Sequence, residues 1–147
     1  MHGLVERRAV LLGAGGVLTV GLFGCSKGEE LSESEWNERL KEALQQLDFV
    51  RELRGVAYSL VGMFFTKDAW ISGWVVTDAG DESELRRHLD EIGKTVVEVH
   101  RTNYVSGSWV RLGAIGQDGE PMTFEDALGR KAATLDGLAE HYGIPRH

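Results

Sequence analysis

Histidine, cysteine and carboxylate side chains bind metals and transfer protons, so their spacing indicates which chemistry a chain can carry. The histidines beyond residue 24 are His88, His100, His141 and His147. None of them belongs to an H-x-H, H-x-x-H or H-E-x-x-H pattern, which would bring two ligands to one metal ion. We expect His88 and His141 on the polar sides of their helices. The sequence therefore predicts no metal site and no cofactor.

Nucleophilic and acid–base catalysis also lack a sequence motif here. The chain contains no G-x-S-x-G pattern, in which a serine is activated by a base. Two carboxylate pairs, Asp81 with Glu84 and Asp90 with Glu91, fall on an expected helix, where capping and the helix dipole account for them. A two-carboxylate hydrolase would need such groups to converge in a cleft. We therefore expect no catalytic activity and keep a hydrolase as the least favoured alternative.

Tryptophan is the other side chain that bears on function. In a strand over residues 70–77, Trp70 and Trp74 project to one face, and Ile71 and Val75 project to the other. Trp109 follows on a later expected strand. If helices cover only one face of the sheet, these tryptophans can contact a partner or an apolar ligand from the open face. The alternative is that the rings fill the core beneath the helices, as large aromatic side chains usually do.

Cys25 is the only cysteine, which excludes an intrachain disulfide and a multi-cysteine metal site. Arg7 and Arg8 precede the run Ala9–Phe23, whose 15 residues carry no charge, as in the apolar region of a signal peptide. The ending Leu22-Phe23-Gly24-Cys25 resembles the bacterial lipobox. The resemblance implies that the cysteine is acylated and that the segment before it is removed.

The same arginine pair is similar to the twin-arginine export signal, so that route and the general secretory route both stay open. Two other interpretations of the apolar run fit less well. It is shorter than the roughly 20 residues that a transmembrane helix needs. A dinucleotide-binding motif could begin at Gly13-Ala14-Gly15, but Leu18 stands where the pattern requires its third glycine. An exported lipoprotein is therefore the favoured interpretation.

This interpretation divides the chain into a signal peptide over residues 1–24, a polar lipidated tether over 25–33 and one domain over 34–147. Residues 25–147 contain 14 lysines and arginines and 22 acidic residues, a net charge of −8 that disfavours nucleic acid as a partner. We expect the domain on the outer face of the cytoplasmic membrane, anchored through a lipid on Cys25. Its expected partner is another envelope protein.

Hydrophobic periodicity predicts the elements that position these residues. In chain order we expect a helix capped by Ser32 or Ser34 that stops before Gly55, strands over 56–65 and 70–77, a helix from Asp81 to Gly93, strands over 95–104 and 108–116, and a helix from Thr123 to Gly143. This order predicts an α+β domain in which an N-terminal helix precedes two tandem ββα units. The expected sheet is four-stranded and antiparallel, with helices mainly on one face.

The ending "LAEHYGIPRH" and this layout resemble those of small, uncharacterised lipoproteins of actinobacteria. The resemblance extends over the C-terminal part of the chain and carries no catalytic motif. The favoured function is a membrane-anchored, non-catalytic protein-binding module. The alternative is a carrier that holds a lipid or a small apolar ligand in a pocket between the sheet and the helices.

Overall fold

A computed structural model describes residues 31–63, 66–103, 105 and 107–146. Residues 31–147 cluster into one compact unit. Among the described residues, no helix combines the length and the apolar character that crossing a membrane requires.

Helix α2 (Glu33–Gln45) begins at the predicted capping box, which is confirmed. The Ser32 Oγ accepts the N–H of Glu35 at 3.2 Å, and the Glu35 carboxylate accepts the N–H of Ser32 at 2.8 Å. The prediction that this helix continues toward Gly55 is wrong, because the chain from Val50 onward pairs as strand β2 (Val50–Met63). Leu53 pairs with Val75 of the next strand and packs against the core from β2, which a continued helix would not allow.

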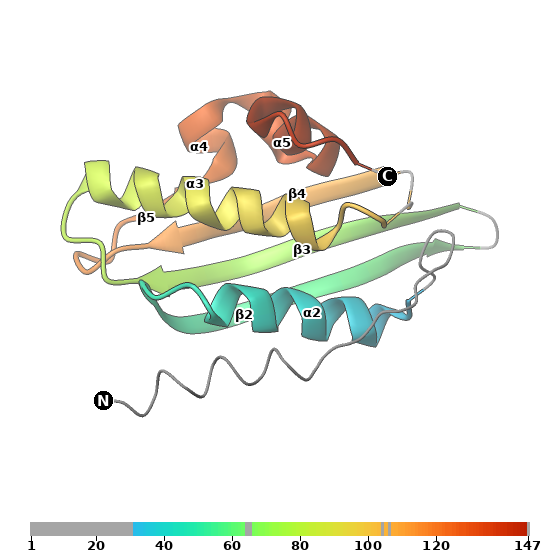
Figure 1. Cartoon of the computed structure of the whole chain (residues 1–147), viewed down its shortest axis with the longest axis horizontal. Coiled ribbons are helices and arrows are strands. Elements are labelled where there is room, and N and C mark those ends of the chain that lie inside the picture. The colour runs from blue at the N-terminus through green and yellow to red at the C-terminus, as the bar shows by residue number, and fades with distance from the viewer. Residues whose placement is uncertain (1–30, 64–65, 104, 106, 147) are drawn as a thin grey trace, which may run out of the picture. The chain divides into compact units, whose positions relative to one another are not determined.

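Four strands form one sheet in the order β2-β3-β4-β5 (Figure 1). Strand β3 (Thr66–Thr77) lies antiparallel to β2, which confirms the predicted hairpin. Strand β4 (Gly107–Ile115) runs parallel to β3, and the short strand β5 (Pro121–Thr123) pairs antiparallel with β4. The sheet is therefore mixed, and the prediction of an antiparallel sheet is wrong.

The parallel pair arises because the predicted strand over residues 95–104 does not form. Helix α3 (Glu82–Val99) continues through Gly93, and its buried residues Ile92, Val96 and Val97 keep the helical spacing. The longer helix carries the chain back from the end of β3 to the level where β3 begins. Strand β4 therefore starts beside the start of β3 and runs parallel to it, as a crossover connection requires. The tandem ββα arrangement is therefore not present in its predicted form, although Asp81 caps α3 as predicted.

The C-terminal region also differs from the single predicted helix. It contains helix α4 (Phe124–Leu128), the 3-10 helix η2 (Arg130–Ala133) and helix α5 (Leu135–Tyr142). The break lies at Gly129, whose φ of +95° is incompatible with a continuing helix. The two predicted ends are confirmed, because Thr123 caps α4 and the left-handed Gly143 ends α5.

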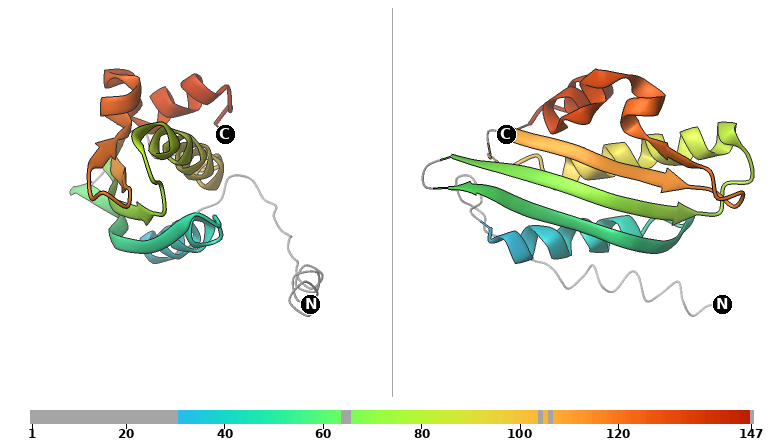
Figure 2. Two further views of the ribbon diagram at one scale, coloured as in Figure 1. Left: turned by 90° about the vertical axis from the view of Figure 1, so that its left-hand side faces the viewer. Right: turned by 180° about the vertical axis from the view of Figure 1, so that it is seen from behind.

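The helices lie on one face of the sheet, as both views of Figure 2 show. Side chains from the covered face of β3 and β4, including Ile71, Val75 and Leu112, are completely buried against them. Trp36, Leu40 and Leu44 of α2 pack into the same core, together with the inward residues of α3. No described helix covers the opposite face of the sheet (Figure 2, right).

Candidate functional site

The uncovered face of the sheet carries the tryptophans of β3 and β4. Trp70 stands opposite Trp109 in the parallel register, and Trp74 stands opposite Gly113. The ring centroids of Trp70 and Trp109 are 6.3 Å apart with an interplanar angle of 38°. Trp109 is 38% exposed, while Trp70 and Trp74 are partly exposed. We call the surface formed by these three residues and Arg111 the tryptophan face.

Arg111 is a member of this surface that sequence analysis did not identify. Its guanidinium lies over the Trp70 ring, 5.0 Å from the centroid, as in a cation–π contact. The side chain is exposed and forms no ion pair with another described residue. A stacked guanidinium keeps its in-plane N–H donors available, and these match a carboxylate. The alternation of β4 placed Arg111 on the face of Trp109, so the signal was present in the sequence.

The position of Trp74 depends on the absence of a side chain at Gly113. A Cβ atom built at Gly113 would lie 2.5 Å from Cζ3 of Trp74 and 2.7 Å from the carbonyl oxygen of Met122. The indole of Trp74 therefore lies directly over the β4 backbone. This packing fixes the ring against the sheet, while its remaining surface stays accessible to solvent.

The alternation predicted for β3 is confirmed by burial. Ile71 and Val75 are fully buried on the helix side, whereas Trp70 and Trp74 lie on the other side. The tryptophan on the core side is Trp36 of α2, which is 2% exposed and lies 5.1 Å from the ring of His100. The sheet tryptophans therefore do not fill the space beneath the helices.

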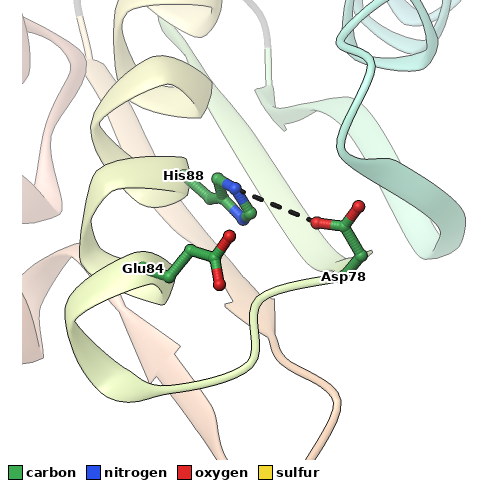
Figure 3. A group of neighbouring side chains, drawn as sticks. All are labelled: Asp78, Glu84 and His88. Carbon is green, nitrogen blue, oxygen red and sulfur yellow. Dashed lines mark ion pairs between the residues drawn. The ribbon is translucent and has the colours of Figure 1, made fainter.

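A second group of candidate functional side chains lies where β3 passes into α3. Asp78 follows β3, and Glu84 and His88 lie one turn apart on α3 (Figure 3). One potential ligand atom from each of the three residues lies within 4.8 Å of the others. We call these three residues the His88 cluster. They come from two elements, and the β3–α3 connection brings them together.

The prediction that His88 lies on the polar side of its helix is wrong, because the residue is only 8% exposed. It follows the buried Leu85 by three residues and precedes the buried Ile92 by four, so it shares their face of the helix. Phe49 covers the imidazole in a parallel stack, with ring centroids 3.9 Å apart. Sequence spacing alone could have indicated this burial. His141 is exposed, as predicted.

The hydrogen bonds of the His88 cluster are incomplete. His88 Nδ1 is buried without a hydrogen-bond partner among the described residues, and Nε2 is 4.0 Å from Oδ1 of Asp78. The other Asp78 oxygen forms an ion pair with Arg51 at 2.6 Å. Glu84 accepts the backbone N–H of Gly80 at 2.9 Å through one oxygen only. Each carboxylate thus retains an oxygen for a further interaction.

His100 has a different environment, inside the core. Its ring stacks on Tyr58 at 5.1 Å, and its Nδ1 lies 3.2 Å from the side-chain amide of Asn103. Asn103 also donates to the Tyr58 hydroxyl at 2.9 Å. Burial, with a smaller effect of the nearby Arg146 charge, lowers the pKa of His100 to about 3. His100 is therefore neutral at physiological pH, and its contacts are those of a residue that packs in the core.

One member of each predicted carboxylate pair makes a structural contact: Asp81 caps α3, and Asp90 joins α3 to α5. Asp81 accepts the N–H of Glu84 as the N-cap at 2.8 Å. Asp90 accepts the hydroxyl proton of Tyr142 at 3.0 Å. The predicted lipidation site Cys25 and the export residues Arg7 and Arg8 lie outside the described residues.

No protein-family model, no curated protein sequence and no solved structure matches the chain.

Proposed function

We propose that the chain is an exported lipoprotein, anchored through Cys25 to the outer face of the cytoplasmic membrane, and that its tryptophan face binds another envelope protein without catalysis. The observation that carries this proposal is the asymmetry of the sheet. Helices cover one face, whereas Trp70, Trp74 and Trp109 lie on the face that no described helix covers. Large, rigid aromatic rings and arginine are the residues most enriched at protein interfaces.

The chemistry of the partner follows from the charges around these rings. Arg111 is the cation stacked on Trp70, within a chain whose net charge is −7. We consider a partner that places apolar side chains on the indoles and a carboxylate beside Arg111. The guanidinium of Arg111 would attract this carboxylate, whereas the net negative charge of the chain would repel acidic groups of the partner elsewhere. Such a pattern orients a partner more than it strengthens binding. Val61, which is 54% exposed, extends the apolar surface onto β2.

The predicted tether limits where this partner can be. Helix α2 and its N-cap Ser32 take up the end of the predicted tether 25–33, so residues 25–30 remain before the compact unit and span at most about 20 Å when extended, at roughly 3.3–3.6 Å per residue. The domain would therefore remain close to the membrane. A membrane protein with an exposed extracytoplasmic surface, or another anchored protein, is within that reach.

The carrier hypothesis has no comparable support. It requires a pocket between the sheet and the helices, where Ile71, Val75 and Leu112 are completely excluded from solvent by packing. We therefore propose the protein-binding function alone.

Site-specific photocrosslinking in intact cells tests the proposal. A photoreactive amino acid at Ser72 lies between Trp70 and Trp74 in the sequence and opposite Arg111 in the register. The same group at Lys41, which is exposed on the helix side, provides the control. We expect one heterologous envelope protein to be crosslinked from position 72 and not from position 41.

A charge reversal then tests whether that adduct depends on the tryptophan face. Arg111→Glu should abolish the adduct from position 72. Arg87→Glu makes the same charge change at an exposed position of α3 and should leave it intact. The proposal is refuted if position 72 gives no adduct, gives only a dimer of this chain, or gives an adduct that survives Arg111→Glu.

A further inference from the structure

We propose that Asp78, Glu84 and His88 form a binding site for a divalent transition-metal ion, with zinc as the best fit. This proposal is independent of the tryptophan face. It rests on the arrangement of the three potential ligand atoms, on the buried imidazole nitrogen and on the charges that surround the cluster.

The geometry requires only a small contraction. One atom from each residue already lies within 4.8 Å of the others. Zinc binds histidine nitrogen and carboxylate oxygen at about 2.0–2.2 Å, so two ligands of a tetrahedral ion are separated by about 3.4 Å. Glu84 and His88 are four residues apart on α3 and face the same direction, while Asp78 approaches from the end of β3 (Figure 3). Rotation of the carboxylate side chains can supply the contraction without a change in the backbone.

The buried imidazole points to a ligand more strongly than the carboxylates do. The His88 side chain is only 10% exposed, and the parallel stack on Phe49 fixes the ring plane. Nδ1 has no hydrogen-bond partner among the described residues, and Nε2 lies 4.0 Å from Asp78, beyond hydrogen-bond distance. Buried polar groups normally have partners, and each exception calls for an explanation. A metal ion bound to Nδ1 is such a partner.

The charges and donor types select the class of metal. Two carboxylates and a neutral imidazole supply a net charge of −2, which neutralises a divalent cation. Imidazole favours zinc and related transition metals, whereas calcium and magnesium prefer sites made of oxygen ligands alone. Three protein ligands would leave one position of a tetrahedral zinc ion for water.

Arg51 is the neighbouring group that opposes a cation. Its guanidinium is 2.6 Å from Oδ2 of Asp78, but Oδ1 of the same carboxylate is the oxygen that faces His88. The side chain of Arg51 is 56% exposed, so it can move into solvent when a cation binds. The Gly80 N–H likewise occupies only one oxygen of Glu84. Each carboxylate can therefore offer the metal the oxygen that its present partner does not occupy, while the positive charge of Arg51 beside Asp78 still opposes the cation.

Isothermal titration of the full-length, metal-free protein with zinc chloride tests the proposal. We expect saturable binding of one equivalent, and a characteristic visible absorption spectrum of low coordination number when cobalt(II) replaces zinc. His88→Gln should abolish this binding, and Glu84→Gln should weaken it at least tenfold. Glu84 is the second variant because its side chain is only partly buried, so its replacement leaves the fold intact.

Matched controls distinguish this site from other histidines and carboxylates. His141→Gln replaces an exposed histidine of α5, and Glu82→Gln replaces a carboxylate on the first turn of α3 that lies outside the cluster. Both should bind zinc as the parent protein does. Arg51→Gln should tighten binding several-fold, because it removes the cation that competes for Asp78. The proposal is overturned if zinc does not bind, if binding survives His88→Gln with the fold retained, or if Arg51→Gln leaves the affinity unchanged or lower.

Discussion

Tyr142 of α5 packs against Gly93 of α3, at a point where a side chain on α3 would not fit. A Cβ atom at position 93 would lie 2.7 Å from both Cε2 and the hydroxyl oxygen of Tyr142, and 2.9 Å from Cε1 of Phe124. The Tyr142 hydroxyl also donates to Asp90 at 3.0 Å, one turn away on α3. Gly93 is therefore a contact residue between helices. The sequence had indicated it as a helix end.

Substitution of this glycine tests the contact. We expect Gly93→Ala to lower the free energy of unfolding by about 1–2 kcal/mol. Overpacking costs roughly 1–3 kcal/mol and outweighs the gain of up to about 1 kcal/mol in helix propensity. Gly80→Ala is the control, because a Cβ atom there meets only Glu84 at 3.7 Å. Urea denaturation of the three proteins measures the difference, and a stabilised Gly93→Ala protein would contradict the contact.

Two tryptophan substitutions should have very different effects on stability. Trp36 is 2% exposed and packs near Tyr58 and His100, so Trp36→Ala should cost about 3–5 kcal/mol. Trp109 is 38% exposed on the tryptophan face, so Trp109→Ala should cost only about 1 kcal/mol. Urea denaturation followed by circular dichroism provides both values. Equal losses would show that Trp109 is as important to the core as Trp36.

Burial of His100 should make stability depend on pH. Its pKa is about 3 in the folded chain, whereas an unfolded histidine has a pKa near 6.5. The unfolded state therefore binds the proton first, and the contribution is lost as pH falls from about 6.5 toward 3. Between pH 8 and pH 5 this histidine should account for a loss of about 2 kcal/mol.

Replacement of His100 isolates this contribution from those of the acidic residues. We expect the difference in unfolding free energy between pH 8 and pH 5 to be about 2 kcal/mol smaller in His100→Gln than in the parent protein. The comparison uses each protein's own pH dependence, so a general loss of stability in the variant does not affect it. The same pH dependence in both proteins would contradict a neutral, buried His100.

The anchoring of the chain has a direct test at Cys25. If the thiol of Cys25 accepts the lipid, as we propose, Cys25→Ala should release the domain from the membrane fraction or leave an uncleaved precursor. Gly24→Ala keeps a small residue before the cysteine and should be processed and anchored normally. Fractionation, together with mass determination of the N-terminal peptide, distinguishes these results. An unprocessed N-terminus in the parent protein would refute the lipoprotein assignment.

The helix ends that the sequence predicted correctly are those at which the capping residue interacts only with the adjacent turn of its own helix. The Ser32–Glu35 capping box, the Asp81 and Thr123 caps and the left-handed Gly143 all formed as predicted. The alternation in β3 was also predictable, because successive side chains of a strand point to opposite faces. These features depend on residues that are close together in the chain.

The segment from Thr95 to Val99 shows where local preference failed. Its β-branched residues favour a strand, but Val96 and Val97 also continue the buried stripe that begins at Leu85. The helix forms because it buries Val96 and Val97 against the sheet. Since this segment is helical and not a strand, the next strand after β3 is β4, which runs parallel to β3.

Sequence by itself thus determined the α+β class, the hairpin, most caps and the placement of Trp70 and Trp74 on the face opposite Ile71 and Val75. Which of these two faces the helices cover was decided by the tertiary structure. Only the tertiary structure decided the strand direction in the sheet, the contact of Arg111 with Trp70 and the meeting of Asp78 with Glu84 and His88. The physical reason is that these relationships join different elements. Their geometry depends on which packed arrangement buries the most apolar surface, and no short spacing in the chain encodes it.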